Sequence, residues 1–308
     1  MSRNIALVHS PRYRNWVFDE SHPTQGRRFI NAQDQLFVAL SGTGIELIET
    51  TPFAANREEL ERVHAPHFVS EVIDQHRSTQ WSGTREDLAE LAKLFVGGTL
   101  VALKLLLDGK TKTAVHFPGA KHHAQFDHSS GFCIFNDFSL AAEIATKDHG
   151  KKVAILDIDA HHGDGTENLT ADNPDVMTFS IHEKGIFPGT GNESIPAKKV
   201  FNFPITDKTL YWESGKGDEA LAEGVASFIY EAIAFAPDLI FIACGADGHS
   251  EDPLSTLQYS TDGFAAIARG IRHNFPDTPI LMGGAGGYLP DTRTPEVWAT
   301  FAKNLIAA

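Results

Sequence analysis

Five ionisable side chains follow a short apolar run in the middle of the chain. After Val153–Leu156 come, within eight positions, Asp157, Asp159, His161, His162 and Asp164. Alternate side chains of a strand share a face, so Asp157 and Asp159 point the same way, as does His161 if the extended path continues. Stacked buried carboxylates are costly unless a cation neutralises them. The spacing therefore predicts a metal site at the end of a strand rather than a polar loop.

Other reactive side chains stand at equivalent places along the chain. Three further apolar runs are followed by a histidine pair, an aspartate and a tyrosine: His122 and His123, Asp247, and Tyr288. In a parallel sheet all strand C-termini lie at one edge, where open α/β folds bind their ligands. Four segments that are remote in the sequence are therefore expected to converge.

Short apolar runs alternate with longer helical patterns. The predicted strands are 5–8, 113–117, 153–159, 176–181, 239–244 and 279–283, and the predicted helices are 86–108, 137–148, 209–235, 261–274 and 294–306. Long loops are predicted at 9–35, 118–135, 182–200 and 245–260. The alternation predicts an α/β fold with a mostly parallel central sheet and helices on both faces. Without a repeat or a flexible linker, residues 1–308 are expected to form a single catalytic domain.

Composition narrows the function classes. Apolar content of 42% and charged content of 21% are ordinary for a globular protein. The net charge of -14 argues against nucleic acid as a standing partner. Cys133 and Cys244 do not form a CxxC pair, which fits a reducing compartment. With neither a secretory signal nor an apolar segment of membrane-spanning length, a cytoplasmic location and no membrane partner are expected. The oligomeric state stays open.

Asp159, His161 and Asp247 offer two carboxylate oxygens and one imidazole nitrogen. Three protein ligands and an open fourth position are typical of a catalytic metal, and this donor set suits Zn²⁺, with Fe²⁺ as the alternative. Asp157 and Asp164 can each orient one of the two adjacent histidines. The tyrosine after the glycine run can stabilise an oxyanion. Together these groups predict metal-assisted attack of water on an amide or ester carbonyl.

With these residues in place, the chain resembles the histone deacetylase family of the arginase–deacetylase superfamily, and in particular its bacterial and class II-like members. The resemblance runs from about Ser10 to Trp298. The motifs that carry it are His122-His123-Ala124, Ser130-Gly131-Phe132-Cys133, Asn136-Asp137, Asp157-x-Asp159-x-His161-His162-Gly163-Asp164-Gly165, Phe187-Pro188-Gly189-Thr190-Gly191, Gly245-Ala246-Asp247 with Asp252-Pro253, and Gly286-Gly287-Tyr288.

The resemblance implies two cation sites. Zn²⁺ would be bound by Asp159, His161 and Asp247. A structural monovalent cation, K⁺, would lie near Asp157, Asp159, His161 and Ser180.

The resemblance also implies the catalytic roles. His123 would act as general base and then as general acid, with His122 as its electrostatic partner. Asp157 would pair with His122 and Asp164 with His123. Tyr288 would bind the oxyanion of the tetrahedral intermediate.

Family members bind the substrate in a narrow tunnel. Phe132 and Phe187 would form its walls, the Gly131 carbonyl would line it, and Leu254 would contact the substrate. Arg28 matches a family arginine behind the metal. Eukaryotic class I enzymes carry an aspartate at the tunnel rim, and the segment His64-Ala65-Pro66-His67 is expected to take its place, with Pro66 at the aspartate's position.

Three rival functions are less well supported. A ureohydrolase with two metal ions would need an aspartate where Gly163 stands. An acetylpolyamine amidohydrolase would carry a glutamate after the Asp-Pro pair, and this chain has Leu254 there. A non-catalytic binding module would have lost at least one metal-binding or catalytic residue, and none is missing. The sequence therefore predicts a zinc-dependent amide hydrolase that removes acetyl or a related short acyl group from an amine, most simply an N-acyl-lysine side chain, with a small acylated amine as the alternative substrate.

Overall fold

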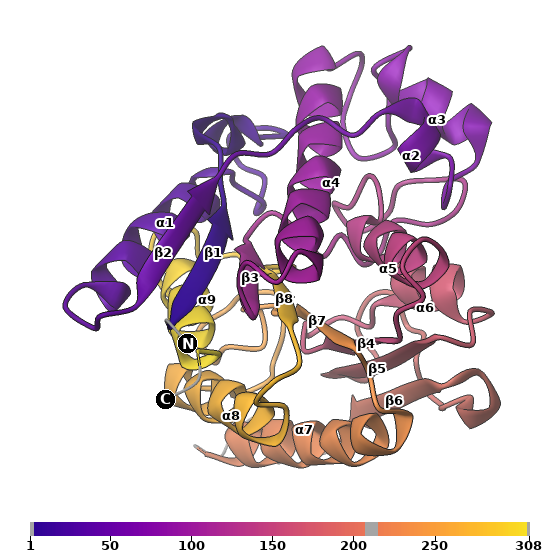
Figure 1. The fold of residues 1–308 in the computed structure, drawn as a ribbon. Helices are drawn as coiled ribbons and strands as arrows, with labels where there is room; N and C mark the ends of the chain where they lie inside the picture. Colours follow the sequence, from indigo (N-terminus) through magenta and orange to yellow (C-terminus); the bar gives the residue numbers. More distant parts are fainter. Residues whose placement is uncertain (1–2, 207–214, 307–308) are drawn as a thin grey trace.

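In the part of the chain that the structure describes, eight strands form a parallel sheet through the centre of the molecule (Figure 1). The computed structural model describes residues 3–206 and 215–306. The strand order within this part of the chain is β2-β1-β3-β8-β7-β4-β5-β6. The strands are β1 Asn4–Val8, β2 Glu46–Thr50, β3 Thr113–His116, β4 Val153–Asp157, β5 Val176–Glu183, β6 Val200–Ile205, β7 Leu239–Ala243 and β8 Ile280–Gly283.

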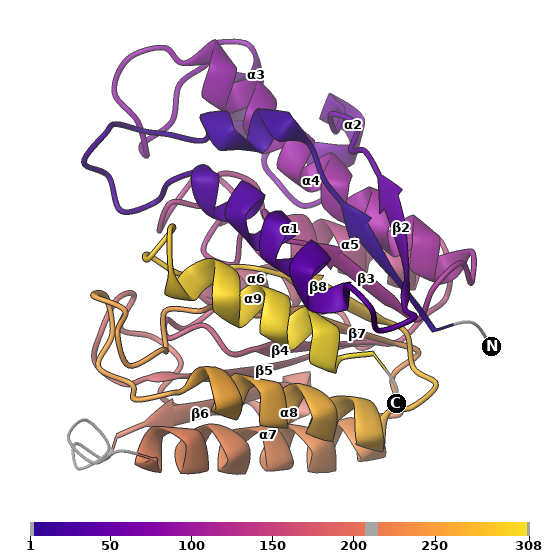
Figure 2. The same ribbon diagram turned by 90° about the vertical axis from the view of Figure 1, so that its left-hand side faces the viewer.

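Helices cover both faces of the sheet. On one face α1, α9, α8 and α7 pack side by side in that order, and α4, α5 and α6 lie on the other (Figures 1 and 2). The helices are α1 Arg27–Leu40, α2 Arg57–Leu60, α3 Pro66–Ile73, α4 Glu86–Leu107, α5 Asp137–Lys147, α6 Asp164–Thr170, α7 Lys216–Phe235, α8 Thr261–Asn274 and α9 Arg293–Asn304, and the 3₁₀ helices are η1 Pro11–Asn15 and η2 Pro196–Lys198. No helix of the described residues is long and apolar enough to cross a membrane.

The central strands are apolar along their whole length because both of their faces are covered. Every residue of β4 and of β7 is buried. The predicted α/β fold with a parallel sheet between two helical layers is therefore confirmed.

The four central strands end level with one another. Asp157 at the end of β4 pairs with Ala243 of β7, Ala243 pairs with Gly283 of β8, and Gly283 pairs with His116 of β3. The loops that follow these strands consequently start at the same height above one edge of the sheet. This register brings residues from four distant parts of the sequence to one place.

The structure corrects several expected elements. β2 and β6 were not predicted, and both are edge strands whose half-exposed side chains break the apolar run. The segment 9–35 is not one long loop, because it contains η1 and the first turns of α1. No side chain caps the start of α1 at Gly26, so its beginning lacks a capping signal in the sequence. The predicted helix 209–235 corresponds to α7, and its positions 209–214 lie outside the described residues.

The extended path predicted through residue 159 is also wrong. β4 ends at Asp157, and the chain bends through Asp159 and His161 before α6 begins at Asp164. The backbone N–H of Asp159 donates to Asp157 Oδ1 at 3.0 Å, which fixes this bend. Asp159 and His161 therefore meet through a turn and not through strand alternation.

Candidate functional site

The reactive side chains lie at the carboxyl edge of the central strands. The loops after β3, β4, β7 and β8 carry, in that order, His122 and His123, Asp159 and His161, Asp247, and Tyr288. All four loops start from the level strand ends, so the predicted convergence is present.

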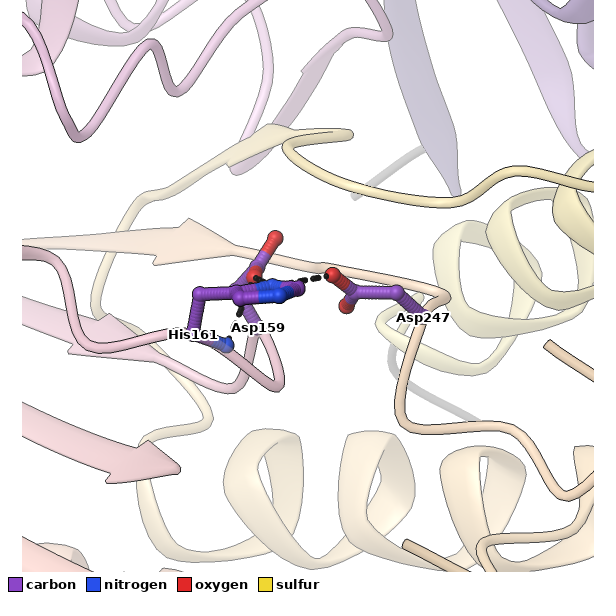
Figure 3. Close-up of side chains that lie close together, drawn as sticks. All are labelled: Asp159, His161 and Asp247. Atoms are coloured by element: carbon purple, nitrogen blue, oxygen red, sulfur yellow. Dashed lines mark hydrogen bonds and ion pairs between the residues drawn. The ribbon is translucent and has the colours of Figure 1, made fainter. Parts of the chain in front are cut away.

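Asp159, His161 and Asp247 form a buried cluster (Figure 3). His161 Nδ1 lies 2.9 Å from Asp247 Oδ2 and 3.1 Å from Asp159 Oδ1. One ligand atom from each residue lies within 4.8 Å of the other two. These are one imidazole nitrogen and two carboxylate oxygens, the donor set of a catalytic divalent metal.

The charges of this cluster favour a cation. Burial alone would lower the pKa of His161, but the hydrogen bonds and charges of the two carboxylates raise it to about 11. Burial and the charge of Asp159 raise the pKa of Asp247 to about 7. Two carboxylates that face a single imidazole with little water to screen them stabilise the protonated imidazole and repel each other. A divalent ion would supply the positive charge that the cluster lacks.

The backbone leaves room for such an ion. Gly286 passes so close that a Cβ there would lie 2.4 Å from Asp247 Oδ2 and 2.5 Å from Asp159 Oδ2. The N–H of Gly286 donates to Asp159 Oδ2 at 2.6 Å, and the N–H of Ala160 donates to Asp247 Oδ1 at 3.0 Å. These bonds orient both carboxylates toward His161. The residues present therefore fit a divalent metal.

His122 lies behind the cluster and carries a positive charge. Its Nδ1–H donates to Asp157 Oδ2 at 2.7 Å, and its Nε2 lies 3.8 Å from Asp159 Oδ2. Burial would lower the pKa of His122, but the charges of Asp157 and Asp159 outweigh it and raise the pKa to about 9. His122 is therefore an imidazolium near pH 7.

His123 has a similar partner and the opposite charge state. Its Nδ1–H donates to Asp164 Oδ1 at 2.7 Å. Burial, followed by the positive charge of His122, lowers the pKa of His123 to about 4. His123 is therefore neutral near pH 7, and the bond at Nδ1 leaves the lone pair on Nε2 available to accept a proton.

Tyr288 is held in place from both sides. Its N–H donates to Asp252 Oδ2 at 2.8 Å, and Arg28 Nη1 donates to the carbonyl of Gly287 at 2.6 Å. The Arg28 guanidinium also lies 5.9 Å from the centroid of the Tyr288 ring. Burial raises the pKa of Tyr288 well above its usual value. The phenol therefore keeps its proton and remains a hydrogen-bond donor.

A cavity of about 410 Å³ opens onto these groups. Its lining consists of Gln80, His123, Gly131, Phe132, His161, Ile186, Phe187, Leu254 and Tyr288. The Phe187 ring lies 5.0 Å from His123, and the Phe132 ring lies 6.1 Å from Tyr288. No Asp or Glu stands among the described residues that line it. The cavity thus has mostly apolar walls and a polar floor.

The rim differs from the expectation. The segment 64–67 does not line the cavity: His64 is buried, its Nδ1–H donates to the carbonyl of Gln125 at 2.8 Å, and its Nε2 accepts from the N–H of Asn136 at 2.9 Å. Pro66 begins α3. The connection between α3 and α4 reaches the cavity instead, through Gln80.

Of the four predicted monovalent-cation residues, Asp159 and His161 belong to the metal cluster itself, whereas Asp157 and Ser180 meet at a separate small cavity that neither Asp159 nor His161 lines. Ser180 of β5 pairs in register with Asp157 of β4, and both line a small cavity of about 10 Å³. Ser180 Oγ also lies 2.9 Å from His182 Nδ1. The space is of the order of one ion or one water molecule.

Two residues of this region were missed by the sequence argument. Asp137 at the start of α5 accepts hydrogen bonds from the N–H groups of Ala120 at 3.0 Å and Lys121 at 2.7 Å. It thereby holds the turn that presents the histidine pair, and Ala120 within that turn has a positive φ of 64°. Gln80 was missed as well. Asp137 is in a quoted motif, whereas Gln80 has no distinctive signal in the sequence.

Comparison with known sequences identifies the family. The histone deacetylase domain profile matches residues 22–305. The acetoin utilization protein AcuC of Bacillus subtilis is 32% identical over 96% of this chain and 81% of that protein. Histone deacetylase 1 of Homo sapiens is 29% identical over 93% of this chain and 61% of that protein.

Comparison with known structures supports the same fold. The crystal structure of the HDA15 HD domain superposes with a TM-score of 0.83 and covers 98% of this chain and 88% of that chain. The sequence identity is 24%, so this similarity concerns the fold alone.

Proposed function

This chain belongs to the histone deacetylase family, and from that premise we propose that it is a zinc-dependent hydrolase that removes acetyl or a related short acyl group from the side chain of N-acyl-lysine. The observation that carries the proposal is the buried Asp159–His161–Asp247 cluster, whose His161 lines a cavity. His123 and Tyr288 line the same cavity.

Asp159, His161 and Asp247 would hold the metal, and a Zn²⁺ there would act as a Lewis acid toward the amide carbonyl and the attacking water. Zn²⁺ is preferred over Fe²⁺ because zinc binds both imidazole nitrogen and carboxylate oxygen, and three protein ligands with an open fourth position are typical of catalytic zinc. K⁺ is proposed at Asp157, Asp159, His161 and Ser180.

His123 would move the protons. Because its pKa lies at about 4, its Nε2 is unprotonated and accepts a proton from the attacking water. The same nitrogen then donates this proton to the leaving amine as the carbon–nitrogen bond breaks. Asp164 holds the ring orientation through Nδ1, and the charge of His122 stabilises the negative charge that develops nearby.

Tyr288 would donate a hydrogen bond from its phenolic O–H to the oxyanion and keep its proton. Its raised pKa supports this role, because the group must remain a donor while negative charge accumulates. Phe132 and Phe187 would flank the extended acyl-amine chain, and the Gly131 carbonyl and Leu254 would contact it.

The cavity lining supports acyl-lysine over acylated polyamines. Leu254 lines the cavity, and the described lining residues carry no carboxylate that would bind a distant ammonium group. The alternative, an acetylpolyamine amidohydrolase, would need such a charge near the mouth. Among the described residues, Asp159, His161 and Asp247 form the cluster of His and carboxylate side chains that could hold a metal, which supports one catalytic ion rather than the pair of a ureohydrolase.

We place the protein in the cytoplasm, as one catalytic domain over residues 1–308, with neither nucleic acid nor a membrane as a partner. The two cysteines support a reducing compartment, because both are free and buried. The net charge of -14 opposes binding to a phosphate backbone.

A metal-replacement assay tests the proposal. The purified protein is treated with a chelator, reloaded with Zn²⁺ or Fe²⁺, and assayed on acetyl- and butyryl-lysine peptides beside acetylated putrescine and spermidine. We expect activity to vanish on chelation and to return with Zn²⁺, with the highest kcat/KM on a lysine peptide.

Two variants provide the control. Asp159→Asn should abolish both bound metal, measured by plasma mass spectrometry, and activity, whereas Asp172→Asn should change neither, because that side chain is 91% exposed on the surface. Full activity of the chelated enzyme would refute the metal mechanism. A higher kcat/KM on acetylspermidine than on every lysine peptide would favour the polyamine alternative.

A further inference from the structure

We propose that Gln80 is a positioning residue that sets the Gly131-Phe132 wall of the cavity and, through this wall, the alignment of His123 and Tyr288. The inference rests on the proposed function, since it concerns the same site. Gln80 comes from the connection between α3 and α4, and lines the cavity together with these residues.

Both polar atoms of the Gln80 side-chain amide form hydrogen bonds. The backbone N–H of Phe132 donates to Gln80 Oε1 at 2.8 Å. Gln80 Nε2 donates to Thr79 Oγ1 at 3.1 Å and lies 3.4 Å from the carbonyl oxygen of Ser129. Phe132 needs an acceptor and Ser129 needs a donor, so the orientation of the amide is defined.

Further hydrogen bonds fasten the same two loops together. Ser78 Oγ lies 2.6 Å from Ser129 Oγ, and Thr79 Oγ1 donates to the Ser129 carbonyl at 3.0 Å. Residues 78–80 are thus hydrogen-bonded to Ser129, two positions before Gly131. Together with the bond from the Phe132 N–H to Gln80, these bonds connect two loops that lie more than fifty positions apart in the sequence.

The Gly131-Phe132 wall needs stabilising hydrogen bonds because both of its residues have a positive φ. Gly131 has a φ of 51° and Phe132 a φ of 64°. The left-handed region is unfavourable for a bulky side chain, and such a conformation persists only where the surroundings impose it. The bond from Phe132 N–H to Gln80 is one such constraint, and losing it would free the wall to relax.

Movement of the wall would reach both reactive side chains. A Cβ on Gly131 would lie 2.3 Å from His123 Cδ2, so the wall rests directly on the His123 ring. The Phe132 ring packs edge-on against Tyr288 with centroids 6.1 Å apart. Gln80 therefore affects catalysis through the packing of Gly131 and Phe132 against His123 and Tyr288, and its uncharged side chain adds no charge at the mouth of the cavity.

Three variants test this assignment on an acetyl-lysine peptide. Gln80→Met keeps the length of the side chain but removes both the acceptor and the Nε2 donor, and Gln80→Glu removes the same donor, keeps the acceptor for the Phe132 N–H and adds a negative charge. Gln75→Met is the matched control, a glutamine with an exposed side chain in the same connection. Each is compared with the wild-type enzyme for kcat, KM, Tm and hydrogen exchange of the Phe132 amide.

Loss of the acceptor should act mainly on kcat. We expect Gln80→Met to lower kcat about tenfold, the effect of one hydrogen bond on the alignment of the reacting groups, with KM changed about twofold or less. The Phe132 amide should exchange about tenfold faster. Gln80→Glu should restore both values to within about threefold of wild type and should lower KM for acetylspermidine. Gln75→Met should match the wild type.

The outcomes separate this inference from the proposed function. An inactive wild-type enzyme would contradict the proposed function, whereas the exchange rate of the Phe132 amide would still test the contact. Unchanged kcat and unchanged exchange in Gln80→Met would overturn the role of Gln80. If Gln80→Glu is as impaired as Gln80→Met, the acceptor is not what matters and the inference fails.

Discussion

Two adjacent histidine–aspartate pairs differ in charge although their geometry is the same. The pairs His122–Asp157 and His123–Asp164 both have a nitrogen–oxygen distance of 2.7 Å, and both histidine side chains are 5% exposed. The pKa of His122 is nevertheless raised to about 9, and that of His123 is lowered to about 4.

The difference arises from what surrounds each pair. His122 faces a second carboxylate, Asp159, at 3.8 Å, whereas His123 faces the positive charge of His122 itself. The carboxylate of Asp164 is also shared, because Gln125 Nε2 donates to its Oδ2 at 2.8 Å. One hydrogen bond to an aspartate therefore does not decide the protonation of a buried histidine, and the net charge nearby does.

The largest expected difference between the two pairs is in turnover. His123→Asn should lower kcat by about 10²–10⁴-fold, because it removes the neutral base, while His122→Asn should lower it by roughly 10–100-fold, since an electrostatic partner is lost but the base remains. Steady-state kinetics on an acetyl-lysine peptide measures both, with bound metal quantified as a control. Equal losses in the two variants would break the distinction between base and partner.

The second largest expected difference between the two pairs is in how each affects the pH dependence of the free energy of unfolding. The folded pKa of His122 lies above the unfolded value of 6.5, so its contribution is complete below pH 6.5 and is lost as the pH rises through 9. The folded pKa of His123 lies below 6.5, so its environment costs stability as the pH falls from 6.5 to 4. Each effect is on the order of 3 kcal/mol.

Urea unfolding between pH 4 and 9.5, in the presence of a chelator, checks this expectation. His122→Asn should flatten the alkaline loss of stability, and His123→Asn should flatten the acid loss. The same change in profile for both variants would show that the two pKa values are not split by their surroundings.

Glycine substitutions probe each pair sterically. A Cβ on Gly131 would lie 2.3 Å from His123 Cδ2, and a Cβ on Gly163 would lie 2.3 Å from Asp157 Oδ2. We expect either alanine variant to lower the free energy of unfolding by about 1–3 kcal/mol, as overpacking does. Gly131→Ala should cost more, since its φ of 51° adds backbone strain. Equal or smaller destabilisation by Gly131→Ala in urea unfolding would contradict this order.

The smallest effect is expected at a third pair, which lies on the surface. His128 Nδ1 and Asp127 Oδ1 are also 2.7 Å apart, but both side chains are 57% exposed. Asp127→Asn should leave kcat/KM unchanged and Tm within the scatter of the wild type, because water screens the pair. A clear loss of Tm would show that distance matters more than surroundings.

The sequence predicts this fold best where the strands are fully covered. β4 and β7 read as unbroken apolar runs because helices lie on both faces, and their ends were placed to within two residues. The edge strands β2 and β6 were missed, because partial exposure mixes polar residues into their pattern. α1 was missed as a whole, although Phe29, Ala32 and Leu36 recur with the period of a helix.

The functional site also has some features that could be predicted from the sequence and others that could not. The meeting of Asp159, His161 and Asp247 could be expected, because these residue types follow strand ends of one parallel sheet. The bend after Asp157 and the contribution of Gln80 could not. Gln80 acts through a contact with the backbone of Phe132, which depends on how two loops pack and not on any pattern in either.

The place of β8 in the sheet affects how the protein can be made. β8 lies between β3 and β7, so it joins the group β2-β1-β3 to the group β7-β4-β5-β6. Until residues 280–283 have emerged from the ribosome, the growing chain exposes two unpaired strand edges in what will become its centre. A chain truncated before Ile280 would therefore contain two separate half-sheets, each with an unpaired, aggregation-prone strand edge, and would not form a smaller enzyme.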